Sequence, residues 1–298
     1  MTDERFADVG RGITLCYTET GDPGGAPLVL VAGLGMQLNS WPPGFRDLLA
    51  ERGFRVIAFD NRDVGRSTHA DYKPPSLPAI LRGRIPAHAY HLGDLARDTA
   101  GLLDALGVPS AHLVGVSMGA MIAQTVAVHF PARVRTLTSI MSTTGARRVG
   151  RPALSTWRLL AGRPPRTRAE AVARGVRIFR HIGSHGFPFD EAAVGERAGV
   201  AWDRDRSSAG TGRQLAAIYA SGDRTRELRE VRVPTLVVHG DRDRMVHPSG
   251  GRVTHETIAD SRLVVIPGLG HDLPAGAWPR FADLIAGHAR DRSSDVPA

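Results

Sequence analysis

The chain has 298 residues, of which 42% are apolar and 23% charged, as is typical of a globular protein with one large domain. No stretch approaches the ~20 consecutive apolar residues that cross a bilayer, so we expect no stable membrane association. The N-terminal sequence MTDERFADVG lacks the apolar segment of a secretory signal, and Cys16 is the only cysteine. We therefore predict a cytoplasmic protein without disulfides or a cysteine-based zinc site.

The formal net charge of +8 raises the question of nucleic-acid binding. Lys73 is the only lysine among 38 basic residues, a bias typical of codon usage rather than of selection for phosphate binding. The sequence shows no basic run interleaved with aromatic residues and no zinc-finger, RRM or KH signature. We expect a small-molecule ligand and no nucleic-acid partner, while the oligomeric state stays open.

Short strand-like runs alternate with amphipathic stretches along the chain. Strands are predicted at residues 28–31, 55–59, 112–116, 135–141, 235–239 and 263–266. Several are apolar on both faces, as buried parallel strands are. Leucines at helical spacing predict a helix over 92–106, and a second helix is predicted over 118–130. This alternation predicts an α/β fold with a mainly parallel central sheet flanked by helices.

The alternation stops after Met141 and resumes at Val233. Within the intervening sequence, amphipathic helices are predicted at 154–160, 169–182, 190–202 and 213–220. The sequence therefore predicts three segments. They are the first part of an α/β core at residues 1–145, a helical insertion at 146–228, and the second part of the core at 229–298.

A G-x-S-x-G motif, Gly115-Val116-Ser117-Met118-Gly119, lies between the predicted strand at 112–116 and the helix after it. In that context the motif predicts a nucleophile elbow, with Ser117 exposed on a tight strand-to-helix turn. Only glycine-sized neighbours two residues away avoid collisions there. The oxyanion hole is expected to use the N–H of Met118, at the start of the helix, and that of Leu34 in the loop after an early strand.

A nucleophilic serine needs a base, and the base needs an orienting acid. His271 follows the predicted strand at 263–266, and Asp243 follows that at 235–239. Both belong to loops at the carboxyl edge of a parallel sheet, where the serine also lies. We predict His271 as base and Asp243 as acid, with Asp241 as the alternative acid.

The chain resembles the α/β-hydrolase fold superfamily, and within it the aclacinomycin methylesterase and actinobacterial lipase-esterase group. The residues that carry this resemblance are VAGLGMQLNSW at 31–41, FDNRDVGRST at 59–68, VGVSMGAMIAQ at 114–124, GFPFD at 186–190, VPTLVVHGDRD at 233–243 and IPGLGHDLP at 266–274. The resemblance implies an acid three residues after the glycine of the H-G-x-x-D run, which selects Asp243. It also implies that the helical insertion caps the active site.

The segment at 59–68 departs from the family pattern, because Asp63 stands where relatives often carry glycine. Asp60, Arg62 and Ser67 in this segment are predicted to brace a loop rather than to react. A second departure is Ala32-Gly33, where many relatives have His-Gly. The oxyanion hole stays plausible, because its donor is a backbone N–H.

These residues predict a serine hydrolase that cleaves a carboxylic ester, for instance a methyl ester, of a small and largely apolar substrate through an acyl-enzyme. Carbon–carbon bond hydrolysis and cofactor-free perhydrolase or haloperoxidase chemistry are alternatives, since they use the same three residue types. A non-enzymatic alternative is a small-molecule receptor on the same fold. Serine at position 117 argues against a haloalkane dehalogenase, whose nucleophile is a carboxylate.

We predict neither a cofactor nor a metal. His181 and His185 have the spacing of helical metal ligands, but Gly183 and Gly186 interrupt the helix and no carboxylate pair accompanies them. Arginines are concentrated at residues 147–180, where Glu170 is the only acidic residue. This segment is expected to be locally positive, either as a solvated surface or as an attractor of anionic molecules.

Overall fold

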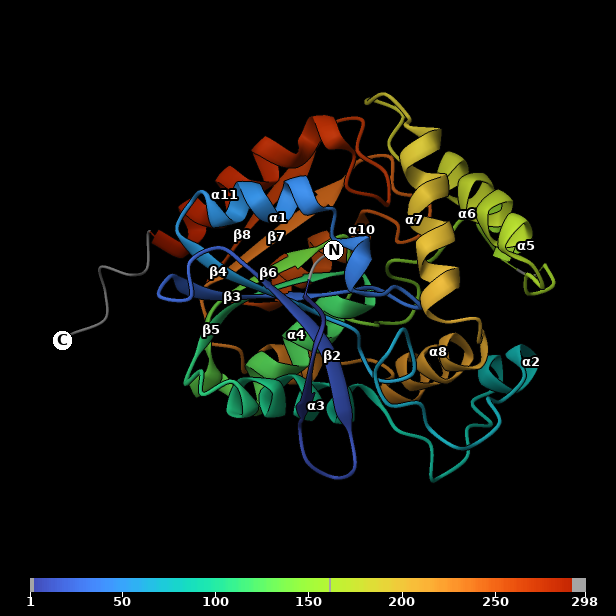
Figure 1. The fold of residues 1–298 in the computed structure, drawn as a ribbon, viewed down its shortest axis with the longest axis horizontal. Coiled ribbons are helices and arrows are strands. Elements are labelled where there is room, and N and C mark those ends of the chain that lie inside the picture. The colour runs from blue at the N-terminus through green and yellow to red at the C-terminus, as the bar shows by residue number, and fades with distance from the viewer. Residues whose placement is uncertain (1–2, 161, 291–298) are drawn as a thin grey trace.

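One mixed sheet forms the centre of the computed structural model, which describes residues 3–160 and 162–290 (Figure 1). Within these ranges eight strands follow the order β1-β2-β4-β3-β5-β6-β7-β8. They are β1 (Arg5–Asp8), β2 (Thr14–Thr20), β3 (Ala26–Val31), β4 (Phe54–Phe59), β5 (Ala111–Val116), β6 (Val134–Ile140), β7 (Thr235–Gly240) and β8 (Ser261–Ile266). The pairings β1–β2 and β2–β4 are antiparallel, and all pairings from β4 to β8 are parallel. The carboxyl ends of β3 to β8 therefore share one edge of the sheet.

Helices cover both faces of this sheet. The helices α1 (Pro43–Ala50) and α11 (Trp278–Arg290) pack together on one face, and α3 (Leu92–Ala105) and α4 (Met118–His129) pack together on the other (Figure 1). The helix α10 (Ser249–Thr257) lies against β7 and β8. The core segments also contain three short 3-10 helices, η1 (Leu38–Ser40), η2 (Pro131–Arg133) and η3 (Ala275–Ala277).

The core is divided between the two faces of the sheet because side chains alternate along each strand. In β3, Val29 and Val31 belong to the cluster under α3 and α4, whereas Leu28 and Leu30 belong to the cluster under α1 and α11. All four side chains are fully buried. Burial on both faces explains why these strands are continuous apolar runs in the sequence.

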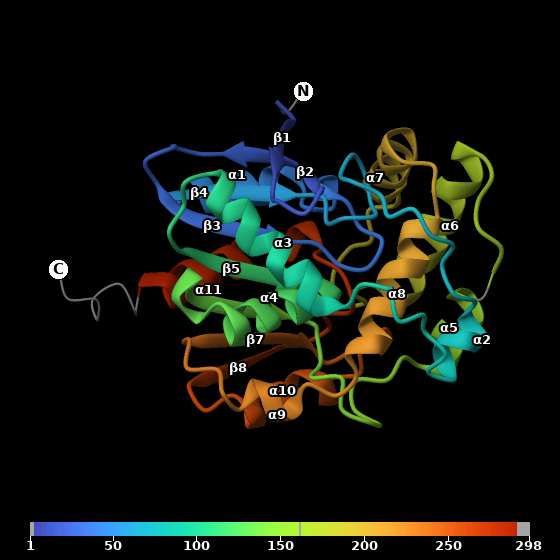
Figure 2. The same cartoon turned by 90° about the horizontal axis from the view of Figure 1, so that it is seen from below.

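A group of helices lies beyond the carboxyl edge of the sheet (Figure 2). Its members from the helical insertion are α5 (Leu154–Leu160), α6 (Arg168–Ile182), α7 (Glu191–Arg204) and α8 (Ala209–Ser221), and α2 (Leu77–Leu81) packs against α8. The short helix α9 (Thr225–Leu228) instead packs against α4 and α10. Within the described part of residues 146–228 there is no strand. None of the helices in the described ranges combines the length and apolar composition that a bilayer span requires.

The six predicted strands are confirmed to within two residues at each end, and the predicted helices are confirmed, with α8 starting four residues earlier than expected. The sequence analysis missed β1 and β2, because β1 is an edge strand with only Ala7 buried and β2 has three apolar residues flanked by threonine and glutamate. It also missed α1, α2, α9, α10 and α11. The helices α2 and α9 have five and four residues, too few to show a helical period, whereas the 13 residues of α11 carry an apolar face that was overlooked.

Substitution of Gly119 tests how closely α4 approaches β3. A Cβ atom at this position would lie 2.0 Å from the carbonyl oxygen of Val31, at the end of β3. We expect Gly119→Ala to lower the free energy of unfolding by about 3 kcal/mol, because backbone on both sides must shift. Urea unfolding monitored by circular dichroism measures the change.

Gly287→Ala is the matched control, since a Cβ atom there meets no atom within 4 Å and the residue lies inside α11. Alanine is the better helix former, so this variant should gain about 0.5–1 kcal/mol. Equal stabilities for the two variants would contradict the close approach of α4 to β3.

Candidate active site

Ser117 occupies the turn between β5 and α4 in a strained backbone conformation. Its φ of 56° is positive, in the region that side chains other than glycine rarely adopt. A Cβ at Gly115 would lie 2.3 Å from the carbonyl oxygen of Gly119, so glycine is required on both sides of the turn. The hydroxyl of Ser142 donates to the Ser117 carbonyl at 2.8 Å and holds the turn against β6. The predicted elbow geometry is therefore present, with the Ser117 side chain partly exposed.

Two backbone N–H groups lie beside this serine. Met118 is the first residue of α4, and the loop after β3 passes so close that a Cβ on Gly33 would lie 3.5 Å from Cβ of Ser117. Among the described residues, the N–H groups of Met118 and Leu34 donate to no protein acceptor. The N–H of Gly35 donates to Oε1 of Gln214 in α8 at 2.8 Å, which fixes the loop. A negatively charged oxygen at this place would also be stabilised by the N-terminal end of α4.

His271 and Asp243 are brought together from the loops after β8 and β7. Nδ1 of His271 lies 2.7 Å from Oδ2 of Asp243, and the two side chains are 10% and 0% exposed. The other carboxylate oxygen, Oδ1, accepts hydrogen bonds from the N–H groups of Met245 and Val246, both at 2.8 Å. The carboxylate is thus held in one orientation, with Oδ2 directed at the imidazole ring.

The second candidate acid, Asp241, has a different role. Its Oδ1 accepts the N–H of Gly268 at 2.7 Å, and its side chain is 40% exposed. Among the described residues it makes no hydrogen bond to His271. Asp241 therefore anchors the loop after β8 at a position three residues before His271 in the sequence. Asp243 contacts His271 itself.

A second histidine contacts Asp243, and the sequence analysis missed it. His239 in β7 is fully buried, and its Nε2 lies 2.9 Å from the carbonyl oxygen of Val246 and 3.4 Å from Oδ2 of Asp243. Burial by itself would raise the pKa of Asp243, but the charge of His271 and hydrogen bonds from both histidines lower it well below its usual range. The carboxylate therefore stabilises the fold above its unfolded-state pKa of about 3.9, and that contribution is lost as the pH falls through the lowered value.

The loop that carries His271 also contacts the helical insertion. The N–H of His271 donates to the carbonyl oxygen of Ile182 at 2.7 Å, and Ser184 donates its hydroxyl to Asp272 at 2.5 Å. The N–H of Gly270 donates to that same hydroxyl at 2.9 Å. Burial raises the pKa of Asp272, although the hydrogen bonds from Ser184 oppose this effect. The end of α6 and the residues after it therefore position the histidine loop.

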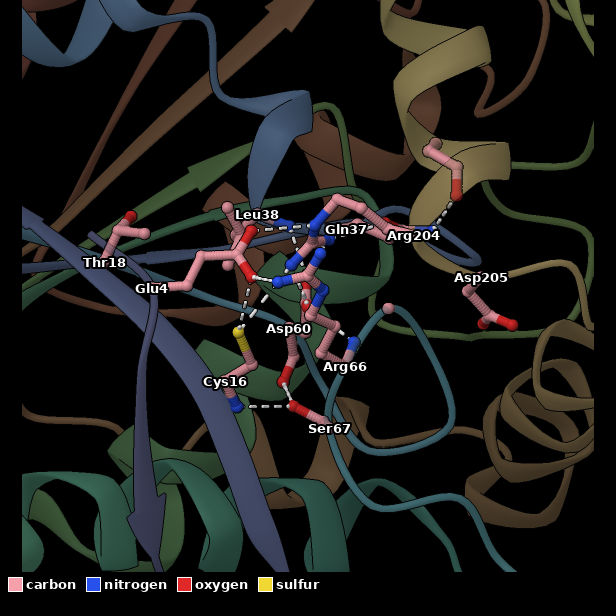
Figure 3. Close-up of polar contacts among 12 residues, drawn as sticks. Glu4, Cys16, Thr18, Gln37, Leu38, Asp60, Arg66, Ser67, Arg204 and Asp205 are labelled. Atoms are coloured by element: carbon pink, nitrogen blue, oxygen red, sulfur yellow. Dashed lines mark hydrogen bonds and ion pairs between the residues drawn. The ribbon is translucent and has the colours of Figure 1, made fainter. Parts of the chain in front are cut away.

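Asp60, after β4, joins the core to the helical insertion (Figure 3). Its buried carboxylate accepts the N–H of Leu38 at 2.7 Å, the N–H of Arg66 at 3.0 Å, and Nη2 of Arg204 at 2.7 Å. The hydroxyl of Ser67 donates to the Asp60 carbonyl at 2.6 Å. The expected bracing role of Asp60 and Ser67 is confirmed, and it extends to the loop after β3 and to α7.

Arg204, the last residue of α7, is the centre of this network (Figure 3). Its side chain is 7% exposed, and it donates to Oε1 of Gln37 at 2.5 Å and to Oε1 of Glu4 at 3.0 Å. The Cys16 thiol lies 3.7 Å from Nη2 of Arg204. Burial, with the negative charges of Asp60 and Glu4, raises the pKa of Cys16 to about 12, so the thiol stays protonated and unreactive.

The contacts of the Asp63 side chain explain why this chain has aspartate where relatives often have glycine. It adopts a φ of 74°, which glycine would adopt more readily, but its carboxylate forms two hydrogen bonds to Arg213 of α8, at 2.9 and 2.6 Å. Both side chains are at least nine-tenths buried. Arg62 behaves as expected and braces the loop through Asp98, at 2.5 Å. The strained aspartate thus provides a second buried ion pair between the core and the helical insertion.

Within the described residues, no group of three or more His, Cys, Asp or Glu side chains is placed to hold a metal ion. Nε2 of His181 lies 3.2 Å from the hydroxyl oxygens of Ser155 and Thr156. This histidine therefore links α6 to α5.

The sequence profile described as alpha/beta hydrolase fold matches residues 26–274 of the chain. The chain belongs to this family. It is 30% identical to rhodomycin D methylesterase DauP of Streptomyces sp. (strain C5), over 93% of this chain and 95% of that protein. It is 26% identical to a non-heme haloperoxidase of Rhodococcus erythropolis, over 94% of this chain and 98% of that protein.

The fold of this hydrolase is also found in solved structures. With a TM-score of 0.74 and 20% identity, it is similar to 2-hydroxy-6-oxo-6-phenylhexa-2,4-dienoate hydrolase from Rhodococcus sp. strain RHA1, covering 97% of this chain and 99% of that one. The sequence relatives thus include proteins named as a methylesterase and as a haloperoxidase, and the likeness to the dienoate hydrolase is one of fold.

The buried pair of Arg204 and Asp60 provides a stability prediction. Arg204→Met leaves the Asp60 carboxylate buried without its cation, so we expect the free energy of unfolding to fall by about 3–5 kcal/mol. Arg168→Met is the control, because Arg168 pairs with Asp203 at 2.9 Å on the surface, with both side chains more than half exposed. That exposed pair should contribute less than about 1 kcal/mol. Comparable losses in urea unfolding of the two variants would contradict a stabilising role for the buried network.

Proposed function

We propose that this hydrolase cleaves a carboxylic ester of a small, largely apolar substrate through an acyl-enzyme, with Ser117 as nucleophile, His271 as base and Asp243 as acid. The observation that carries the proposal is the 2.7 Å contact between His271 and the buried carboxylate of Asp243, at the sheet edge where the strained elbow presents Ser117. The similarity to a methylesterase over nearly the whole chain supports an ester, and a methyl ester in particular.

In the proposed reaction, Nε2 of His271 accepts the hydroxyl proton as Oγ of Ser117 attacks the ester carbonyl. The N–H groups of Leu34 and Met118 stabilise the oxyanion that forms. His271 then gives the proton to the departing alcohol, and it activates a water molecule that releases the acid product. Asp243 keeps the proton of the imidazole on Nδ1 and stabilises the imidazolium.

The helical insertion is proposed as the cap of this site, with residues 146–228 as its extent. Three contacts support this proposal, since they tie the insertion to the loops that carry the proposed site residues: Ile182 to His271, Gln214 to Gly35, and Arg204 to Gln37. A cap held in this way shapes the space above Ser117 and excludes water from it.

Carbon–carbon bond hydrolysis and haloperoxidase or perhydrolase chemistry are competing activities, since both occur among the proteins that this chain is similar to. A substrate panel separates them: aryl methyl esters, a vinylogous diketone, and monochlorodimedone with bromide, acetate and peroxide. We expect methyl-ester hydrolysis to have the highest kcat/KM. A receptor of the same fold would turn over none of the three.

Ser117→Ala tests the nucleophile. We expect kcat for p-nitrophenyl acetate to fall by at least about 10⁴-fold, since only transition-state stabilisation by the oxyanion hole and substrate binding would remain. A fluorophosphonate probe should label the wild-type protein at Ser117 and leave the variant unlabelled. Unchanged hydrolysis by a variant with a native circular dichroism spectrum would refute the mechanism.

Asp243→Asn and Asp241→Asn form a matched pair. In Asp243→Asn the amide oxygen of the new side chain can still accept the two backbone N–H groups, but its NH₂ group would face Nδ1 of His271 and favour the wrong tautomer. We expect kcat to fall by about 10⁴-fold in Asp243→Asn and by less than about tenfold in Asp241→Asn. Equal losses, or a larger loss at Asp241, would overturn the assignment of the acid.

A further inference from the structure

A second candidate binding site lies in the helical insertion, where α6 and the loop before it border an open surface pocket of about 380 Å³. This part of the chain belongs to the helices beyond the sheet, at the right in Figure 1. The pocket is lined by Arg163, Pro164, Pro165, Arg166, Glu170, Ala173, Arg174 and Arg177. Its size suits a small ligand, and four of its eight lining residues are arginines.

The arginines of this pocket lack acidic partners. Among the described residues, no carboxylate forms an ion pair with Arg163, Arg166, Arg174 or Arg177, although many other arginines of the chain are paired. The carboxylate of Glu170 accepts the backbone N–H of Arg166 at 2.7 Å. The pocket therefore carries an excess of positive charge that one carboxylate cannot neutralise.

Other arginines on the same helix behave differently. Arg168 and Arg180 form ion pairs with Asp203 and Glu191, both of which lie on α7. The helix thus has one set of arginines neutralised by its neighbour α7, and another set that lines the pocket without an ion-pair partner among the described residues. Solvation of the surface alone does not require the unpaired arginines to line one pocket.

Arg174 is held in place within the pocket. Its Nη1 donates to the carbonyl oxygen of Arg163 at 3.2 Å, and its Nη2 donates to that of Leu160 at 3.0 Å. Burial and the positive charge of Arg177 lower the pKa of Arg174, so the site disfavours this charge as it stands. A bound anion would remove that penalty. Pro164 and Pro165 fix two backbone φ angles in the loop opposite.

We propose that this pocket binds a multivalent phosphate-bearing anion. Guanidinium groups present paired N–H donors that match the oxygens of phosphate, and the pocket offers four of them. The phosphate belongs either to a soluble phosphorylated molecule or to an anionic lipid headgroup, and the two sources share this recognition chemistry.

Isothermal titration of the full chain with pyrophosphate tests the proposal. We expect saturable binding that weakens as salt is raised, and at least a tenfold loss of affinity in the double variant Arg174→Met, Arg177→Met. The matched control is Arg168→Met, Arg180→Met, which removes the same charge from the same helix and should change the affinity by less than threefold. The single variant Arg177→Gln, which keeps the contacts of Arg174 with the loop, should also bind at least threefold more weakly.

Absence of pyrophosphate and vesicle binding, or equal losses in the two double variants, would overturn the proposal. Sedimentation with phosphatidylglycerol vesicles, compared with phosphatidylcholine vesicles, distinguishes the sources of the phosphate. Binding of pyrophosphate alone supports a soluble ligand, and vesicle binding that depends on Arg174 and Arg177 supports a headgroup. Ser117→Ala protein should bind equally well, so the outcome is independent of the proposed ester hydrolysis.

Discussion

The close approach of β3, β5 and α4 is the constraint on which the rest of this structure depends. Gly115 and Gly119 leave no room for a side chain, and Ser117 between them has a positive φ. Because α4 begins at the end of β5, its free N–H groups lie beside the serine, and the loop after β3 is forced against the same place. Strain in one residue is thus maintained by a rigid, fully packed sheet, which is how proteins hold reactive groups in unfavourable conformations.

Parallel pairing then determines where the other groups lie. Since β5, β6, β7 and β8 run in the same direction, the loops after β7 and β8 reach the edge at which Ser117 is presented. Asp243 is oriented by two N–H groups of its own loop, so its contact with His271 is set by the local backbone. His239 provides a further contact from within β7 and contributes to the lowered pKa of Asp243.

The helical insertion is connected to this core by charged groups buried in pairs. Asp60 with Arg204, and Asp63 with Arg213, place two carboxylates of the β4 loop against α7 and α8. Buried ion pairs contribute little net stability compared with apolar packing, but loss of one partner is costly, so they specify one arrangement of the two parts. The same contacts reach Gln37 and Leu38, and the loop after β3 is therefore positioned jointly by the core and the insertion.

The sequence by itself determined the parallel core, the helical character of the insertion, the elbow at Ser117, and the loops that carry Asp243 and His271. These are local properties, because strand periodicity, glycine spacing and the position of a residue after a strand are all readable within about ten residues. Residues outside such patterns were missed. β1 and β2 are too polar to stand out, and His239 resembles an ordinary buried strand residue until Asp243 is seen beside it.

Only the tertiary structure decided the contacts between distant segments. Arg204 and Asp60 are 144 residues apart, and Gln214 and Gly35 are 179 apart, so no sequence period relates them. The same holds for the arginines of residues 147–180. Their excess of charge is visible in the sequence, but which are neutralised by α7 and which share a pocket depends on the packing of α6. Charge pairing is set by distances in space, and those exist only once the chain has folded.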